Sequence, residues 1–211
     1  MNRRQGRPSE EGFIETQSPA GRNMHAGTAR ETEGGGTPGR DDRWSRGPCR
    51  NRMQALERRL RAPLPGLTAQ LAMAPEGRIS PDYDPDPPGA LDAAVLLLVS
   101  RSQELAFIRR ATDGRAHSGQ IAFPGGAREP GDQDLIMTAL RETEEEIGVP
   151  ATEVTVLGRL TPLYISVSNF VVHPIVGCID HWPGFVCQES EVDGVYTLPI
   201  SEFATVRDER G

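Results

Sequence analysis

The chain has 211 residues, of which 25% are charged and 36% hydrophobic, and its formal net charge at pH 7 is −7. This length fits one globular domain with a tail and is short for two ordinary domains. The net negative charge argues against nucleic acid as the main partner, because neutralising phosphates needs a basic face.

The apolar runs and the cysteines narrow the class of protein further. The best apolar run, residues 93–99, has the length of a strand, far short of a membrane-spanning helix. The cysteines Cys49, Cys178 and Cys187 have no metal-ligand spacing, and their odd number indicates reduced thiols. We therefore expect a cytoplasmic protein without a membrane partner.

Residues 1–50 are rich in Gly, Arg, Ser, Glu and Pro and have no sustained apolar period. Such a segment buries too little apolar surface to offset its ordering entropy, so we predict a disordered tail. Met53 is an alternative start of translation. Residues 51–89 form a predicted lead-in, in which apolar spacing indicates a short helix and then a second helix or turn. A Pro/Asp-rich linker, residues 81–88, follows.

The folded body is predicted over residues 90–211. Hydrophobic runs bounded by turn residues predict strands at 93–100, 105–109, 120–123, 154–160, 163–166, 170–178 and 195–198. Apolar periodicity predicts one helix at 135–147, ended by Gly148 and Pro150, and a further helix begins within 199–205. One central helix among many short strands indicates a mixed-sheet α/β domain.

The predicted helix 135–147 carries an unusual set of charges. Its apolar stripe includes Leu140 and Ile147, and we expect Glu142, Glu145 and Glu146 to gather on a different face. Like charges at this spacing repel one another unless a cation lies between them, and hard divalent cations prefer oxygen ligands.

A solvated acidic face is the alternative interpretation of these glutamates. The acids occupy the C-terminal half of the helix, where the helix dipole disfavours negative charge, and Arg141 is the cation nearby. This position favours a metal site. The preceding Phe123–Gly126 and the turn-rich residues 127–134 add a backbone that can approach a ligand closely, as metal-assisted attack on a phosphate ester requires.

Residues 126–149 resemble the Nudix box. Gly126 is followed by five residues and Asp132, then by eight residues, Arg141-Glu142, two residues, Glu145-Glu146, Ile147, Gly148 and an apolar residue. Three positions depart from the pattern: Asp132 replaces a Glu, one residue is added before Arg141, and Thr143 occupies an apolar position. The resemblance implies that Glu142, Glu145 and Glu146 ligate Mg²⁺ or Mn²⁺ and that Arg141 orients the carboxylates.

The resemblance also implies a fold, a Nudix-type α/β/α sandwich. Proteins of this family usually continue beyond the strand predicted at 195–198, with a further strand and helix. We therefore expect the C-terminal part of the sandwich to be truncated in this chain.

The stretch before the box is similar to the signature of the coenzyme A pyrophosphatases within this family. Ser100–Ser102 and Arg115–Gly126 carry that similarity. It implies cleavage of coenzyme A or acyl-CoA into 3′,5′-ADP and (acyl)phosphopantetheine. A small-molecule diphosphate is thus the expected partner.

Several polar residues are further candidates. Arg109, Arg110, His117 and Gln120 are predicted to bind substrate, because they lie at the edge of the box and Arg matches phosphate oxygens. Glu145 or a loop acid, Glu191, is predicted to be the general base. For Arg109, Arg110 and Glu191 a solvated surface position is the competing interpretation, and His173 and His181 are interpreted as structural.

Two other functions stay open at this point. The same fold can serve ADP-ribose, a dinucleotide polyphosphate or a damaged nucleotide, against which the Arg115–Gly126 signature argues. A catalytically silent Nudix-like binding module is the third hypothesis, and the complete set of helix carboxylates argues against it.

Overall fold

The computed structural model describes residues 48–73, 83–112 and 118–204. Four α-helices, one 3-10 turn and eight strands follow one another there, in the order α1 (Pro48–Arg61), α2 (Leu67–Met73), β1 (Leu91–Ser100), β2 (Glu104–Arg110), β3 (Ile121–Ala122), β4 (Gly125–Ala127), α3 (Leu135–Ile147), η2 (Ala151–Glu153), β5 (Thr155–Arg159), β6 (Leu163–Ile165), β7 (Phe170–Ile179), β8 (Val192–Pro199) and α4 (Ile200–Ala204). Among these described helices, none has both the length and the apolar character needed to cross a membrane.

The strands form one eight-stranded mixed sheet, with the main order β3-β2-β1-β7-β5. Its longest ladder is parallel and pairs β1 with β7 from Leu91–Phe170 to Ser100–Ile179. Strands β2 and β4 pair antiparallel with β1, and β8 pairs antiparallel with β2. The prediction of a mixed α/β sheet is confirmed.

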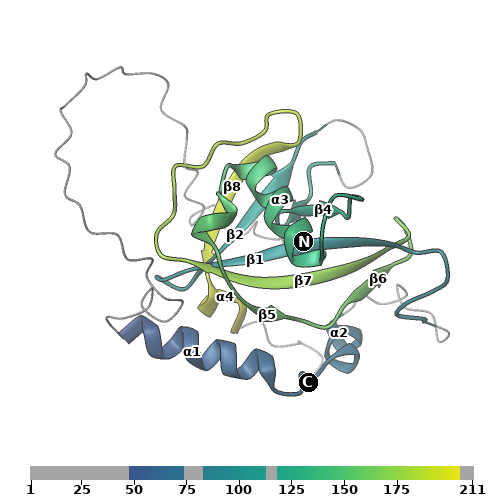
Figure 1. The fold of residues 1–211 in the computed structure, drawn as a ribbon, viewed down its shortest axis with the longest axis horizontal. Coiled ribbons are helices and arrows are strands. Elements are labelled where there is room, and N and C mark those ends of the chain that lie inside the picture. Colours follow the sequence, from purple (N-terminus) through teal and green to yellow (C-terminus); the bar gives the residue numbers. More distant parts are fainter. Residues whose placement is uncertain (1–47, 74–82, 113–117, 205–211) are drawn as a thin grey trace, which may run out of the picture.

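Helices cover both faces of the sheet, with α3 on one side and α1 on the other (Figure 1). On the α3 side, Leu96, Leu98, Ile108, Ile147 and Ile175 form the centre of the larger core. On the α1 side, the smaller core consists of Met53, Val99, Leu157, Val176 and Cys178. Burial on both faces explains why the sequence of β1 is almost continuously apolar rather than alternating.

The lead-in packs directly on the sheet. A Cβ at Gly158 of β5 would lie 2.9 Å from the Cβ of Leu60, so α1 lies close to this strand. Gln70 Nε2 donates a hydrogen bond to the carbonyl of Thr161 at 2.7 Å. Helix α1 begins at Pro48, within the last residues of the predicted 1–50 tail. Residues 1–47, and residues 81–82 of the predicted 81–88 linker, lie outside the described residues, whereas residues 83–88 of the linker are described and form neither helix nor strand.

One strand was not predicted. Residues 125–127 form β4 and pair with residues 95–93 of β1, where the sequence indicated a strand ending and a loop beginning. Two glycines and an alanine have little intrinsic preference for a strand. The pairing depends instead on the close approach that Gly125 permits, because a Cβ there would lie 2.2 Å from the carbonyl oxygen of Ala94.

Candidate active site

Helix α3 spans the predicted residues 135–147, and its ends are capped. The Asp134 side chain is the N-cap and accepts hydrogen bonds from the backbone N–H groups of Ile136 and Met137. These N–H groups belong to the first turn and have no partner within the helix. Thr143, which departs from the apolar pattern, is fully buried and donates its hydroxyl proton to the carbonyl of Ala139 at 2.7 Å. The buried hydroxyl group of Thr143 therefore has its hydrogen-bond partner within the helix itself.

The three helix glutamates lie within one arc of α3, as their spacing predicts, but they differ in burial. Glu146 is only 2% exposed and lies on the buried side of α3 beside Ile147. The Glu145 side chain is 59% exposed, and that of Glu142 is 15% exposed. The 100° rotation per residue separates Glu145 from Glu146, so one faces solvent and the other faces the sheet.

Glu146 is a buried carboxylate with little compensation. Its Oε2 accepts a hydrogen bond from the backbone N–H of Gly125 at 2.8 Å. Its Oε1 lies 3.9 Å from Nη1 of Arg110. Burial raises the pKa of Glu146 to about 7, although the Gly125 N–H and the Arg110 charge oppose the rise. A cation at this carboxylate would relieve the cost of burying its charge.

Glu142 occupies space that a glycine leaves free. A Cβ at Gly126 would lie 2.5 Å from Oε2 of Glu142, so a larger residue at this position would displace the carboxylate. Burial raises the pKa of Glu142, while the neighbouring guanidinium of Arg141 lowers it. The two glycines before the helix thus support two carboxylates. Gly125 donates a hydrogen bond to Glu146, and Gly126 leaves room for the side chain of Glu142.

Arg141 joins the loop before α3 to the glutamates. Its Nε and Nη2 donate to the two carboxylate oxygens of Asp132 at 3.0 and 3.1 Å. Its Nη1 lies 2.9 Å from Glu142 Oε1 and 3.0 Å from Glu145 Oε2. These contacts hold the pKa of Asp132 well below its usual range, with Arg141 as the largest cause. The guanidinium therefore fixes Glu142 and Glu145 relative to Asp132.

Arg109 and Arg110 lie on opposite faces of the sheet. Arg110 follows Ile108 on the α3 face and points to Glu146. Arg109 lies on the other face, with Nε 3.6 Å from Asp193 Oδ2 and its guanidinium 5.9 Å from the centre of the Tyr196 ring. The structure brings Arg110 to the carboxylates and leaves Arg109 away from them, so of the two only Arg110 is placed to meet a substrate held there.

Glu191 lies directly before β8, beside the end of β2 that carries Arg110. Its charge contributes least among the causes that raise the pKa of Glu142 and of Glu146. Its backbone is fixed, because its N–H donates to Gln188 and its carbonyl accepts from Ala111. The sequence alone placed Glu191 in a polar loop, and the path of that loop is a tertiary feature.

The two remaining predicted substrate residues lie near the end of β2 or outside the described part of the chain. Gln120 is exposed, and its carbonyl accepts a hydrogen bond from the Arg110 N–H at 3.0 Å. His117 lies outside the described residues.

The chemistry of the carboxylates fits a hard divalent cation. Among the described residues, no three His, Cys, Asp or Glu side chains converge into a ready-made metal site. Mg²⁺ usually keeps several waters and is held by one or two carboxylates together with substrate phosphates. Buried Glu146 and partly buried Glu142, with Glu145 exposed, match that pattern of few protein ligands.

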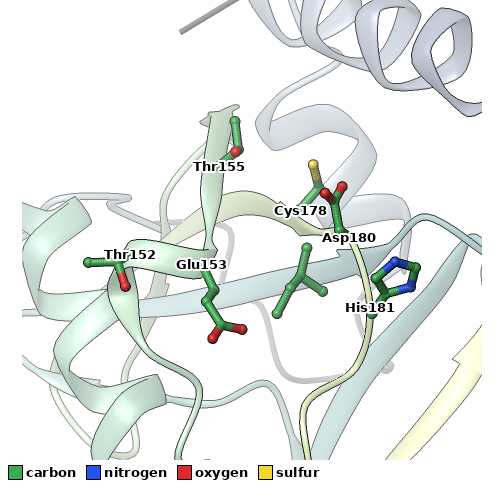
Figure 2. Close-up of a pocket in the computed structure, with 7 residues that line it drawn as sticks. Thr152, Glu153, Thr155, Cys178, Asp180 and His181 are labelled. Atoms are coloured by element: carbon green, nitrogen blue, oxygen red, sulfur yellow. The ribbon is translucent and has the colours of Figure 1, made fainter. Parts of the chain in front are cut away.

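A cavity of about 320 Å³ has none of these carboxylates in its lining, and Figure 2 shows the residues that line it. It lies where β5 begins and β7 ends, and its lining consists of Thr152, Glu153, Thr155, Cys178, Ile179, Asp180 and His181. Burial raises the pKa of the Cys178 thiol to about 12, so this thiol is protonated and a poor nucleophile at neutral pH. Cys178 and Cys187 are both free thiols.

Three residues that support the site were not predicted to do so from the sequence. Asp132 appeared only as a departure from the box, yet it is the main partner of Arg141. Gly125 and Gly126 appeared as turn residues, whereas one donates to Glu146 and the other makes room for Glu142. The adjacent Gly pair was the available signal, since a glycine that must remain a glycine often marks close approach of backbone.

Comparison with known proteins matches this chain to the NUDIX domain family over residues 90–207, more than half of its length. An uncharacterized Nudix hydrolase, NudL, from Yersinia pestis (strain Pestoides F) is 47% identical over 112 residues. That alignment covers 52% of this chain and 56% of the relative, so the chain spans about half the length of the curated relatives it matches. The NudL of Yersinia pseudotuberculosis serotype O:1b matches equally.

Among solved structures, a Nudix hydrolase from M. smegmatis, RenU, aligns with a TM-score of 0.45 and 21% identity. The alignment covers 55% of this chain and 74% of that one.

Proposed function

Because the chain belongs to the NUDIX domain family, we propose that it is a metal-dependent hydrolase of a nucleoside diphosphate derivative. We propose coenzyme A or acyl-CoA as the substrate and Mg²⁺ or Mn²⁺ as the cation. The products are then 3′,5′-ADP and (acyl)phosphopantetheine. A cytoplasmic location follows from the same proposal, and the free thiols of Cys178 and Cys187 support it.

One observation carries the proposed activity. Two largely buried carboxylates, Glu142 and Glu146, lie within the electrostatic field of a third acid, Glu191. Arg141 lies 2.9 Å from Glu142 but shares its charge with Asp132 and Glu145, and the cation beside Glu146 is Arg110 at 3.9 Å. Burying like charges together is costly unless a cation joins them, and the fold holds them there through Gly125 and Gly126.

The residues then have distinct roles. Glu142 and Glu146, with Glu145, would hold the cation, which supplies neutralisation of phosphate charge and a bound water of lowered pKa. Arg141 keeps Glu142 and Glu145 in place. Glu191 or Glu145 accepts the proton of the attacking water. Arg110 binds a phosphate oxygen of the substrate, since guanidinium groups pair well with phosphate. Its side chain is available for this contact, because it is 39% exposed and faces the carboxylates.

The choice of coenzyme A rests on the sequence before the box. The carboxylates recognise only the diphosphate, which coenzyme A shares with ADP-ribose and the dinucleotide polyphosphates. Discrimination must come from groups outside α3. We assign it to Arg110, Gln120 and His117, of which the first two lie side by side at the end of β2.

Product analysis tests this function. The chain is incubated with coenzyme A, ADP-ribose and a dinucleotide polyphosphate, each with Mg²⁺ and with Mn²⁺. We expect 3′,5′-ADP from coenzyme A and the highest kcat/KM for this substrate. ADP-ribose cleaved best would retain the diphosphatase and reject coenzyme A. Binding of all three substrates without cleavage would identify a silent binding module instead.

A further inference from the structure

A closed polar network lies at the turn between β1 and β2, far from the carboxylates. Ser102 Oγ donates to Glu104 Oε2 at 2.6 Å, and the hydroxyls of Ser100 and Ser102 are 2.7 Å apart. The backbone N–H of Glu104 in turn donates to Ser100 Oγ at 3.2 Å. These hydrogen bonds, led by that from Ser102, lower the pKa of Glu104, so its carboxylate is charged at neutral pH.

This network belongs to a motif that the proposed function does not use. Ser100 and Ser102 carry part of the similarity to coenzyme A pyrophosphatases. The strand β2 rises about 3.3 Å per residue, so Glu104 and Arg110 at its two ends lie about 20 Å apart. The hydroxyls are also engaged with one another and with Glu104, which leaves a structural use as the better explanation.

Trp182 links the network to the loop of residues 180–191, which joins β7 to β8. Its indole Nε1–H donates to Glu104 Oε2 at 3.1 Å. The Trp182 ring lies 5.7 Å from that of Phe185, and both pack against the α3-side core. The start of the loop is thereby fixed to the first residue of β2 by a charge-assisted hydrogen bond.

The rest of the loop runs past the C-terminal end of α3 to the start of β8 (Figure 1). Val186 N–H donates to the carbonyl of Ile147 at 3.1 Å, and Gln188 N–H donates to the carbonyl of Glu146 at 2.9 Å. Gln188 then accepts from the N–H of Glu191 at 2.8 Å. The loop thus satisfies two free carbonyls at the end of the metal-binding helix and ends with Glu191 beside the carboxylates.

We propose that Trp182 and Glu104 are positioning residues, which hold the 180–191 loop so that Glu191 is placed at the reacting end of α3. This inference rests on the proposed function, in which Glu191 serves as a base. Trp182 and Glu104 touch neither substrate nor cation. They act through the backbone of the loop, from the end of β2 opposite to Arg110.

The test is a double-mutant cycle in the full chain, with coenzyme A and Mg²⁺. Trp182→Phe keeps an aromatic ring and removes the N–H donor, and Glu191→Gln removes the base. We expect Trp182→Phe to lower kcat about tenfold, since a misplaced catalytic group costs this much or more, while KM changes less than about twofold. In the Glu191→Gln background, Trp182→Phe should cause no further loss.

Two substitutions of Glu104 test whether the hydrogen bond from Trp182 is what matters. Glu104→Gln keeps an oxygen that accepts from Trp182 and should retain most of the activity, whereas Glu104→Met should match the loss of Trp182→Phe. Tyr164→Phe is the control, because it removes a ring donor to Asn169 at 3.0 Å near β6 and should leave kcat unchanged. Amide hydrogen exchange of residues 186–191 should become faster in Trp182→Phe and not in Tyr164→Phe.

Several outcomes would overturn the inference. These are equal losses from Trp182→Phe in both backgrounds, a loss confined to KM, and full activity of Glu191→Gln. Each would leave diphosphate hydrolysis standing. If the parent chain cleaves no diphosphate, the proposed function fails, and unchanged amide exchange in Trp182→Phe would then overturn the anchoring of the loop as well.

Discussion

Asp132 and Arg141 form a bidentate ion pair, in which Nε and Nη2 of the guanidinium donate hydrogen bonds to the two carboxylate oxygens at 3.0 and 3.1 Å. Asp132 also accepts from the hydroxyl of Thr138 at 2.9 Å and from the backbone N–H of Glu129 at 2.9 Å. The pair ties the loop before α3 to the helix, and Arg141 carries the connection on to Glu142 and Glu145. The position of these two glutamates therefore depends on the ionised state of Asp132.

This dependence predicts a pH effect on stability. The pKa of Asp132 is lowered in the folded chain, so its stabilisation is fully present above the ordinary pKa of 3.8. It is lost as the pH falls below that value towards the folded pKa. Asp132→Asn should cost about 1.5–3 kcal/mol at pH 7, the usual value of a hydrogen bond to a charged group.

Urea unfolding of the parent and of Asp132→Asn at several pH values between 6 and 3 checks this prediction. The difference in unfolding free energy between the two proteins should shrink as the pH falls below about 4. A difference that stays constant over the whole range would show that the charge of Asp132 contributes nothing.

Gly126→Ala should impair catalysis more than stability. The new methyl group would lie 2.5 Å from the Glu142 carboxylate, the movable end of a side chain, so the carboxylate shifts at little cost to the fold. We expect kcat to fall by about tenfold or more, because catalytic groups tolerate little displacement. Gly131→Ala is the matched control in the same loop, since a Cβ there meets nothing within 4 Å. Similar kinetics of both variants would refute the role of Gly126.

Arg110 and Arg109 should differ sharply when each is replaced by Gln. Arg110 faces Glu146, whereas Arg109 pairs with Asp193 on the other face of the sheet. Removing a charge-assisted contact to phosphate should lower kcat/KM for coenzyme A about tenfold to a hundredfold in Arg110→Gln. Arg109→Gln should retain parental values.

Dephospho-coenzyme A identifies the phosphate that Arg110 contacts. If Arg110 binds the 3′-phosphate, the Arg110→Gln variant and the parent should hydrolyse dephospho-coenzyme A at similar rates. Equal losses on both substrates would assign Arg110 to the diphosphate instead, and a larger loss in Arg109→Gln would contradict the assignment of faces.

The packing of α1 predicts that the lead-in contributes to stability. Met53 is 5% exposed and belongs to the core on the α1 side of the sheet. Met53→Ala should lower the free energy of unfolding by about 2–5 kcal/mol, as for other large core side chains. Arg58→Ala, at an exposed position of the same helix, should change it by less than about 0.5 kcal/mol. Thermal or urea unfolding of the two variants checks this prediction. An equal change in unfolding free energy in both variants would mean that α1 is not docked in solution.

The sequence predicted α3 to the residue because its signals are local. Apolar periodicity, Gly148 and Pro150 set its C-terminal end, and the Asp134 cap sets its beginning. The strands of the sheet were located for the same reason, through apolar runs separated by turn residues. Strand β4 was missed, because its pairing with β1 depends on a contact between residues 30 positions apart in the chain.

The candidate site shows the same division between local and tertiary information. The spacing of Glu142, Glu145 and Glu146 was visible, yet the burial of Glu146 depends on where the sheet lies. Period-two alternation implies that Arg109 and Arg110 face opposite ways, but only the position of α3 shows which one meets Glu146. The approach of Glu191 depends on hydrogen bonds between its loop and the end of α3, which no local pattern encodes.

The most direct test of the account is Mg²⁺-dependent turnover of coenzyme A by Glu146→Gln beside the parent chain, with circular dichroism to verify the fold. The substitution keeps the shape of the side chain, removes a buried charge and retains an oxygen for the Gly125 N–H. We predict that kcat falls by about two orders of magnitude or more while the melting temperature is unchanged or higher. Near-parental turnover by Glu146→Gln in saturating Mg²⁺ would contradict the central claim that this buried carboxylate holds the catalytic cation.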